Sequence, residues 1–125
     1  MKNIMVCVTK QKTCERLISY GEQLKSSDED SLLIIHVSKS DEKFLGNSKE
    51  SDALKYLYNI AMERGANLIV LKSDNVKDTL ARQVEENNIH KIIVGASDKK
   101  QIEGNFIKEL KDNLAEEVEL IVVPA

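Results

Sequence analysis

Five short apolar runs, separated by four segments of helical periodicity, are the feature that most constrains the fold of this chain. The runs are nearly uninterrupted, as expected of strands buried on both faces, and they cover residues 4–8, 32–35, 68–71, 92–94 and 120–123. Strands joined by helical crossovers run parallel. The alternation therefore predicts an α/β fold in which a five-stranded parallel sheet carries helices on both faces.

Each of the four intervening segments has one apolar stripe at helical spacing. The stripes are Leu17, Ile18, Gly21 and Leu24; Ala53, Leu54, Leu57, Ile60 and Ala61; Val76, Leu80 and Val84; and Phe106, Ile107, Leu110 and Leu114. We expect Thr13 to cap the first helix, Asp74 or Asn75 to cap the third, and Gly65 to follow the end of the second. The polar segment 38–51 is predicted to be a surface loop.

Composition narrows the class of protein. A chain of 125 residues fits one domain, residues 1–125, and no run approaches the ~20 apolar residues of a membrane span. The run at 4–8 is also too short for a secretory signal, so we expect a cytoplasmic protein. A net charge of −3 and few aromatic residues argue against a nucleic-acid partner. Cys7 and Cys14 show no CxxC spacing, which favours a reducing compartment.

In an open parallel sheet, ligands bind outside the carboxyl ends of the strands, where the strand order reverses. The fourth run ends at Gly95, with Ser97 in the following turn and a second glycine, Gly104, nine residues beyond the first. Glycines let backbone N–H groups approach an anion, and a helix that starts at Gly104 points its positive end at the same place. The pattern predicts a phosphate site.

The loop after the first run offers positive charge to that site. Thr9, Lys10, Lys12 and Thr13 bring two hydroxyl and two ammonium groups to the start of a helix. Facing the glycine loop they are suited to hold phosphate. The alternative is a solvated polar turn.

The reactive residue types do not form a catalytic pattern. Cys7 lies inside an apolar run, and the position where a cysteine phosphatase needs arginine is Thr13, so we expect Cys7 to be a buried small side chain. Cys14, at a helix start, could instead have a lowered pKa and respond to oxidants. His36 and His90 have no partner at metal-ligand spacing. We therefore expect no metal and no enzyme, at most weak ATP hydrolysis.

The chain resembles a universal stress protein domain almost from end to end. The matching segments are 4–8 with 14–18, His36-Val37, Arg64-Gly65-Ala66, and most strongly 75–80 with 88–95. The resemblance is greatest to the version found in KdpD potassium-sensor histidine kinases. It implies a Rossmann-like, three-layer α/β/α fold of the adenine nucleotide alpha hydrolase type, with strand order 3-2-1-4-5.

The resemblance also implies a ligand. ATP-binding members carry G-x2-G-x9-G followed by Ser or Thr after the fourth strand; here Gly95 and Gly104 match the outer glycines, and Asn105 takes the hydroxyl position. The implied function is regulatory sensing of ATP, AMP or cyclic di-AMP in stress or potassium signalling. The implied nucleotide-binding residues are Val37 at the base, Thr9 and Lys10 at ribose or phosphate, and Gly95, Ser97, Gly104 and Asn105 at phosphate.

Departures from that motif support a second hypothesis. Asp98 replaces the middle glycine, where its charge would repel phosphate, and the stretch is four residues shorter than the motif. The alternative function is a homodimeric interaction module that has lost the nucleotide. Its partner would be a second copy, paired through an apolar last strand at the sheet edge, made of Leu120, Ile121, Val122 and Val123. The positions of Met1 and Ala125 fit either a stand-alone protein or a fragment of a sensor kinase.

Overall fold

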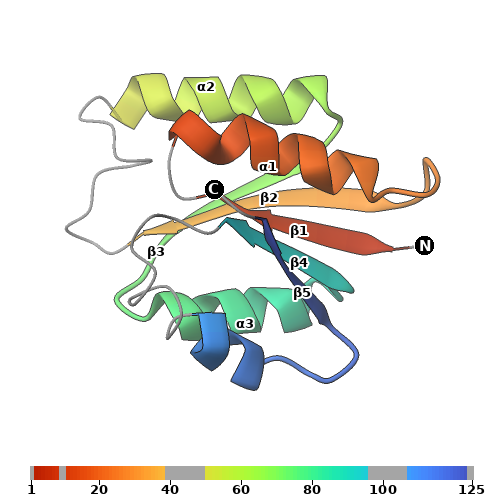
Figure 1. Cartoon of the computed structure of the whole chain (residues 1–125). Helices are drawn as coiled ribbons and strands as arrows, with labels where there is room; N and C mark the ends of the chain where they lie inside the picture. The colour runs from red at the N-terminus through yellow and green to blue at the C-terminus, as the bar shows by residue number, and fades with distance from the viewer. Residues whose placement is uncertain (1, 9–10, 39–49, 96–106, 124–125) are drawn as a thin grey trace.

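The computed structural model describes residues 2–8, 11–38, 50–95 and 107–123, and its strands form one parallel sheet (Figure 1). The strands are β1 Asn3–Cys7, β2 Ser31–Ser38, β3 Asn67–Lys72, β4 Lys91–Gly95 and β5 Glu119–Val123. Their spatial order is β3-β2-β1-β4-β5, and every neighbouring pair is parallel. The predicted fold class and strand order are confirmed.

Helices cover both faces of the sheet. The three long helices are α1 Gln11–Gln23, α2 Glu50–Glu63 and α3 Val76–Glu86, and a shorter helical segment spans 107–112. Figure 1 shows α1 and α2 on one face, with α3 and the short segment on the other. The arrangement is a three-layer α/β/α sandwich.

The core consists of two apolar clusters, one on each face of the sheet. Because side chains alternate along a strand, Ile4 and Val6 of β1 lie in the cluster under α1 and α2, while Met5 and Cys7 lie in the cluster over α3. Gly21 allows α1 to lie close to the sheet, since a Cβ there would be 2.6 Å from Cγ2 of Val6.

Burial on both faces holds for the three central strands and fails at the edges. β1 and β4 have almost fully buried interiors, whereas β3 and β5 expose some of their apolar side chains, including Val70 and Val122. An edge strand has a neighbour on only one side, so helices cover it less completely. The sequence prediction that all five runs are buried on both faces is therefore wrong for β3 and β5.

Two helices end in the same hydrogen-bonded turn. After α2, Gly65 has a φ of 63°, its N–H donates to the Met62 carbonyl, and the Ala66 N–H donates to the Ala61 carbonyl over 2.9 Å. This is the Schellman arrangement, in which the left-handed residue is usually glycine. The prediction for Gly65 is confirmed. Asn88 closes α3 in the same way with a φ of 52°, which the sequence analysis did not anticipate.

The predicted helix starts are partly correct. Asn75 caps α3, because its Oδ1 accepts the backbone N–H of Asp78 over 3.2 Å. Thr13 does not cap α1, since that helix already begins at Gln11 and Thr13 lies in its first turn.

Two further expectations about α2 need correction. Leu54 was predicted to belong to the buried stripe of α2. Its side chain is 46% exposed, whereas Ala53 and Leu57 beside it on the helix are buried. The predicted loop 38–51 is too long at both ends, since Ser38 belongs to β2 and α2 starts at Glu50, one residue before Ser51.

The amino ends of the strands are joined by Asp30. Its carboxylate accepts the backbone N–H groups of Ser26 and Lys2, each over 2.8 Å, and the Ser26 hydroxyl over 3.0 Å. These contacts connect the residue before β1, the turn that follows α1 and the residue before β2. The Ser26 and Lys2 N–H groups hold the pKa of Asp30 well below its ordinary value of 3.8.

This shift gives the stability a definite pH dependence. A carboxyl whose folded pKa is lowered stabilises the protein above the unfolded pKa, near 3.8, and loses that contribution as the pH falls toward the folded pKa. We expect Asp30→Asn to destabilise the protein at neutral pH and to reduce the slope of unfolding free energy against pH below about 5. Urea denaturation at a series of pH values measures both. Asp28→Asn, which removes an exposed carboxylate two residues away, is the control; an equal change of slope there would contradict the assignment.

Candidate functional site

The strand order reverses between β1 and β4. The carboxyl ends of these two strands, which we call the switch point, mark the expected ligand site. The structure places two predicted residues at this edge: Gly95 ends β4, and Val37 is the penultimate residue of β2. The other five predicted residues lie outside the described part of the chain, and they are Thr9, Lys10, Ser97, Gly104 and Asn105.

A buried histidine fixes the carboxyl end of β1 to β2. The Val8 N–H donates to the Ile35 carbonyl over 2.9 Å, and Nδ1 of His36 lies 2.6 Å from the Val8 carbonyl oxygen. Since a carbonyl only accepts, Nδ1 carries the proton and donates. His36 is 3% exposed, so this hydrogen bond is shielded from water. It sets where the chain leaves β1, directly before Thr9.

From the sequence, His36 was weighed as a metal ligand and counted among the residues that match the family, but its hydrogen bond to Val8 was not predicted. A polar residue that directly continues an apolar run was the available signal, because a buried imidazole needs a hydrogen-bond partner.

Gly95 has a steric role in the described structure. A Cβ at this position would lie 3.2 Å from Cδ1 of Leu17, a tight contact that the Leu17 side chain of α1 would have to relieve. The glycine therefore lets α1 lie close to the end of β4, next to the switch point. Whether its N–H also meets a phosphate stays a prediction, because the loop that follows lies outside the described residues.

The two cysteines are buried structural side chains. Burial raises the pKa of the Cys7 thiol to about 12, so the thiol stays protonated at neutral pH, and the interpretation of Cys7 as a small buried residue is confirmed. Burial also raises the pKa of Cys14, whose side chain is hydrogen-bonded to Tyr56. The alternative of a lowered pKa at Cys14 is therefore wrong.

Neither a cluster of metal ligands nor a membrane-spanning helix is present in the described segments. Within them, no group of three His, Cys, Asp or Glu side chains could hold a metal ion. His36 and His90 lie at opposite ends of the strands, and Nδ1 of His90 accepts the backbone N–H of Asn3 over 3.0 Å. None of the described helices has both the length and the apolar character required to cross a bilayer.

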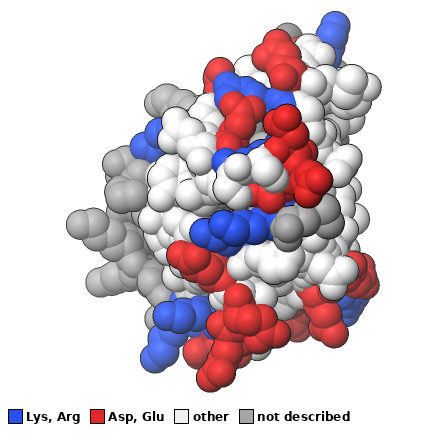
Figure 2. Space-filling view, turned by 90° about the vertical axis from the view of Figure 1, so that its right-hand side faces the viewer, with Lys and Arg blue, Asp and Glu red and all other residues white. Residues whose placement is uncertain are grey.

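Two hollows lie at the edge where the strands begin, away from the switch point. One of about 630 Å³ is lined by the second half of α3, by 88–90 and by 113–118; the other, of about 420 Å³, is lined by residues between Glu22 and Asp28. Figure 2 views the molecule from this side, where acidic and basic side chains are interspersed. A surface of mixed sign offers no continuous basic field for a polyanion.

Comparison with known proteins places the fold. No family model and no curated protein matches the chain. Solved structures do: a universal stress protein in complex with cAMP has a TM-score of 0.71 at 14% identity, over 98% of this chain and 96% of that one. The chain has the universal stress protein fold. The same fold is found in a universal stress protein from Archaeoglobus fulgidus, with a TM-score of 0.67, 16% identity and coverage of 98% and 93%. It is also found in a family member from Arabidopsis thaliana with AMP bound, with a TM-score of 0.59, 17% identity and coverage of 99% and 90%.

The histidine contact at the switch-point edge of this universal stress protein fold can be tested by stability. We expect His36→Phe to lower the free energy of unfolding by about 1–3 kcal/mol, because it leaves the Val8 carbonyl buried without its donor. The matched change His90→Phe should cost less than about 1 kcal/mol, since water can replace an exposed acceptor for the Asn3 N–H. Chemical denaturation measures both values; equal losses would show that the buried contact has no special weight.

Proposed function

We propose that this chain is a regulatory domain that binds an adenine nucleotide at the carboxyl edge of β1 and β4. The supporting observation is the fold, with its switch point between these strands, together with the cAMP and AMP held by two proteins of the same fold. ATP, AMP and cyclic di-AMP are the candidate ligands. In this proposal binding, rather than efficient turnover, produces the signal, and the setting is stress or potassium sensing of the KdpD type.

The described residues support this proposal through their placement. His36 holds the end of β1 against β2, and Val37 lies next to it, where its backbone can meet a base. Gly95 lets α1 approach the end of β4. In the proposal, Thr9 and Lys10 meet ribose and phosphate, and the remaining predicted residues, Ser97, Gly104 and Asn105, complete the phosphate contacts.

Calorimetry with ATP, AMP and cyclic di-AMP at low salt tests the proposal. We expect at least one of them to bind at sub-millimolar concentration, and Lys10→Ala to weaken binding about tenfold by removing a positive charge from the phosphate. Lys25→Ala is the control, because Lys25 lines the smaller hollow at the opposite edge. Binding of none of the three ligands would refute the function, and an equal effect of Lys25→Ala would move the site elsewhere.

A second candidate function is a protein-interaction module that pairs through its last strand. The observation in its favour is that β5 is an edge strand which, among the described residues, pairs with β4 alone and leaves Val122 39% exposed. Such an edge presents backbone groups to another strand. In this proposal Leu120, Ile121, Val122 and Val123 of two copies pair. The negative charge of Asp98 and the shortened loop fit a domain that no longer grips ATP.

The variant Val122→Lys tests the last-strand contact, because a lysine on a sheet edge discourages pairing with another strand. We expect it to lower the weight-average mass in sedimentation equilibrium relative to the unchanged chain at equal concentration. An unchanged mass, with the fold verified by circular dichroism, would rule this contact out.

A further inference from the structure

The larger hollow, between the second half of α3 and residues 113–118, has the size of a small-molecule site. Its volume is about 630 Å³. Sites for small ligands typically measure about 300–1,000 Å³ and combine apolar lining with a few polar groups. The floor of this hollow is the outer margin of the apolar cluster over α3: Val84 and Ile89 are buried, and Leu114 and Val118 pack against the cluster partly buried. The hollow lies at the opposite edge of the sheet from the switch point, so it is separate from the proposed nucleotide site.

Hydrogen bonds to β1 and β5 hold the two walls of the larger hollow together. The His90 N–H donates to the Asn3 carbonyl over 2.8 Å, and the His90 carbonyl accepts the N–H of Glu119 over 3.0 Å. Nδ2 of Asn3 also donates to the Asn88 carbonyl over 3.0 Å. One wall follows α3 and the other precedes β5, so these contacts fix the spacing of the walls. A ligand would enter a site whose backbone is already in place, which lowers the entropic cost of binding.

The charged side chains that line the larger hollow are both acidic. They are Glu85, near the end of α3, and Glu117, in the segment before β5, and none of the described lining residues is Lys or Arg. His90 adds no positive charge, because its Nδ1 accepts the Asn3 N–H over 3.0 Å and therefore carries no proton. The carboxyl end of a helix is the negative end of its dipole, and α3 has no basic residue in its last turn. Both features favour a cation here.

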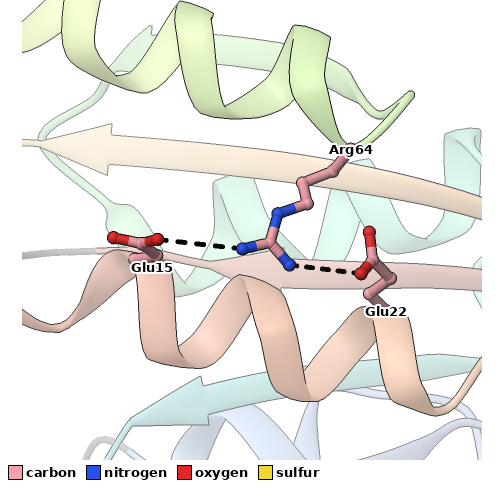
Figure 3. A network of polar contacts seen from close by, with 3 residues as sticks. All are labelled: Glu15, Glu22 and Arg64. Carbon is pink, nitrogen blue, oxygen red and sulfur yellow. Dashed lines mark hydrogen bonds and ion pairs between the residues drawn. The ribbon is translucent and has the colours of Figure 1, made fainter.

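Another part of the chain shows how two such carboxylates are balanced. On the opposite face of the sheet, the Arg64 guanidinium lies between two carboxylates of α1, at 3.8 Å from Glu15 and 3.1 Å from Glu22 (Figure 3). Neither Glu85 nor Glu117 forms an ion pair with a described residue. The cation that Arg64 supplies between its two carboxylates therefore has no counterpart from the described chain in the larger hollow.

We propose that the larger hollow binds a small organic cation, a protonated amine carried on an apolar body. The apolar body lies on the floor formed by Val84, Ile89 and their neighbours, and the ammonium group lies beside Glu85 and Glu117. The same carboxylates repel an anion, and a neutral molecule of the same shape gains the apolar contacts without the ion pairs. This site goes beyond the proposed nucleotide binding and does not depend on it.

The test is a titration of the full chain, without nucleotide, followed by the amide signals in nitrogen-15 NMR. The probe is phenethylammonium, and the controls are 2-phenylethanol and 3-phenylpropionate, which share its ring and two-carbon arm but are neutral and negative. At constant pH and ionic strength, we expect the cation to give saturable shifts at Asn88, Ile89 and Val118 with a dissociation constant of about 1 mM, and both controls to bind at least about tenfold more weakly. No saturation by about 10 mM, equal binding of the neutral control, or shifts confined to other residues would overturn the proposal.

Variants of the acidic residues separate this site from a general attraction of cations to an acidic protein. Glu85→Gln and Glu117→Gln should each weaken phenethylammonium binding about threefold to tenfold, and Glu117→Lys should abolish it, because the chain then supplies the cation itself. Glu116→Gln is the matched control, since Glu116 is exposed and adjacent but does not line the hollow. With the fold of each variant verified by circular dichroism, an equal loss in Glu116→Gln, or no loss in the other three, would refute the assignment. Because no nucleotide is present, these outcomes are independent of the proposed nucleotide binding.

Discussion

The burial of β1 in the middle of the sheet is the constraint on which the other features depend. This strand pairs with β2 on one side and β4 on the other, and its side chains alternate between two apolar clusters. Because β2 and β3 lie on one side of β1, the chain must cross to the other side of β1 before it forms β4. That crossing creates the reversal of strand order, so the interaction that builds the core also defines the candidate ligand edge.

The two ends of the sheet are stabilised differently. At the amino ends, polar side chains join several segments: Asp30 binds the backbone of Lys2 and Ser26, and Nδ2 of Asn3 donates to the carbonyls of Asn87 and Asn88. At the carboxyl ends, the described hydrogen bond from a side chain of one strand to the backbone of another segment is that of His36 with Val8. Among the described residues, the hydrogen bonds from side chains that join different segments are therefore more numerous at the amino ends of the strands.

The sequence predicted the features that depend on local chemistry or on the spacing of apolar residues. Strand positions follow from uninterrupted apolar runs, and Gly65 and Asn75 follow from the conformations that helix ends require. The wrong predictions concern residues whose exposure depends on which elements pack against them. Leu54 fits the helical spacing but lies exposed on α2, and the exposure of β3 and β5 follows from their edge positions, which the spacing of apolar residues does not encode. In the candidate site, Val37 and Gly95 were found because strands end there. The loop residues depend on backbone conformations that no period specifies, so their roles remain predictions.

The proposed nucleotide site and the candidate interface at the last strand share one part of the sheet. Gly95 ends β4 in the candidate site, and β4 pairs with β5 along the ladder from Lys91 to Gly95. A nucleotide regulates pairing through the last strand only if it binds the monomer and the dimer with different affinity, and by linkage the dimer must then change the nucleotide affinity by the same factor.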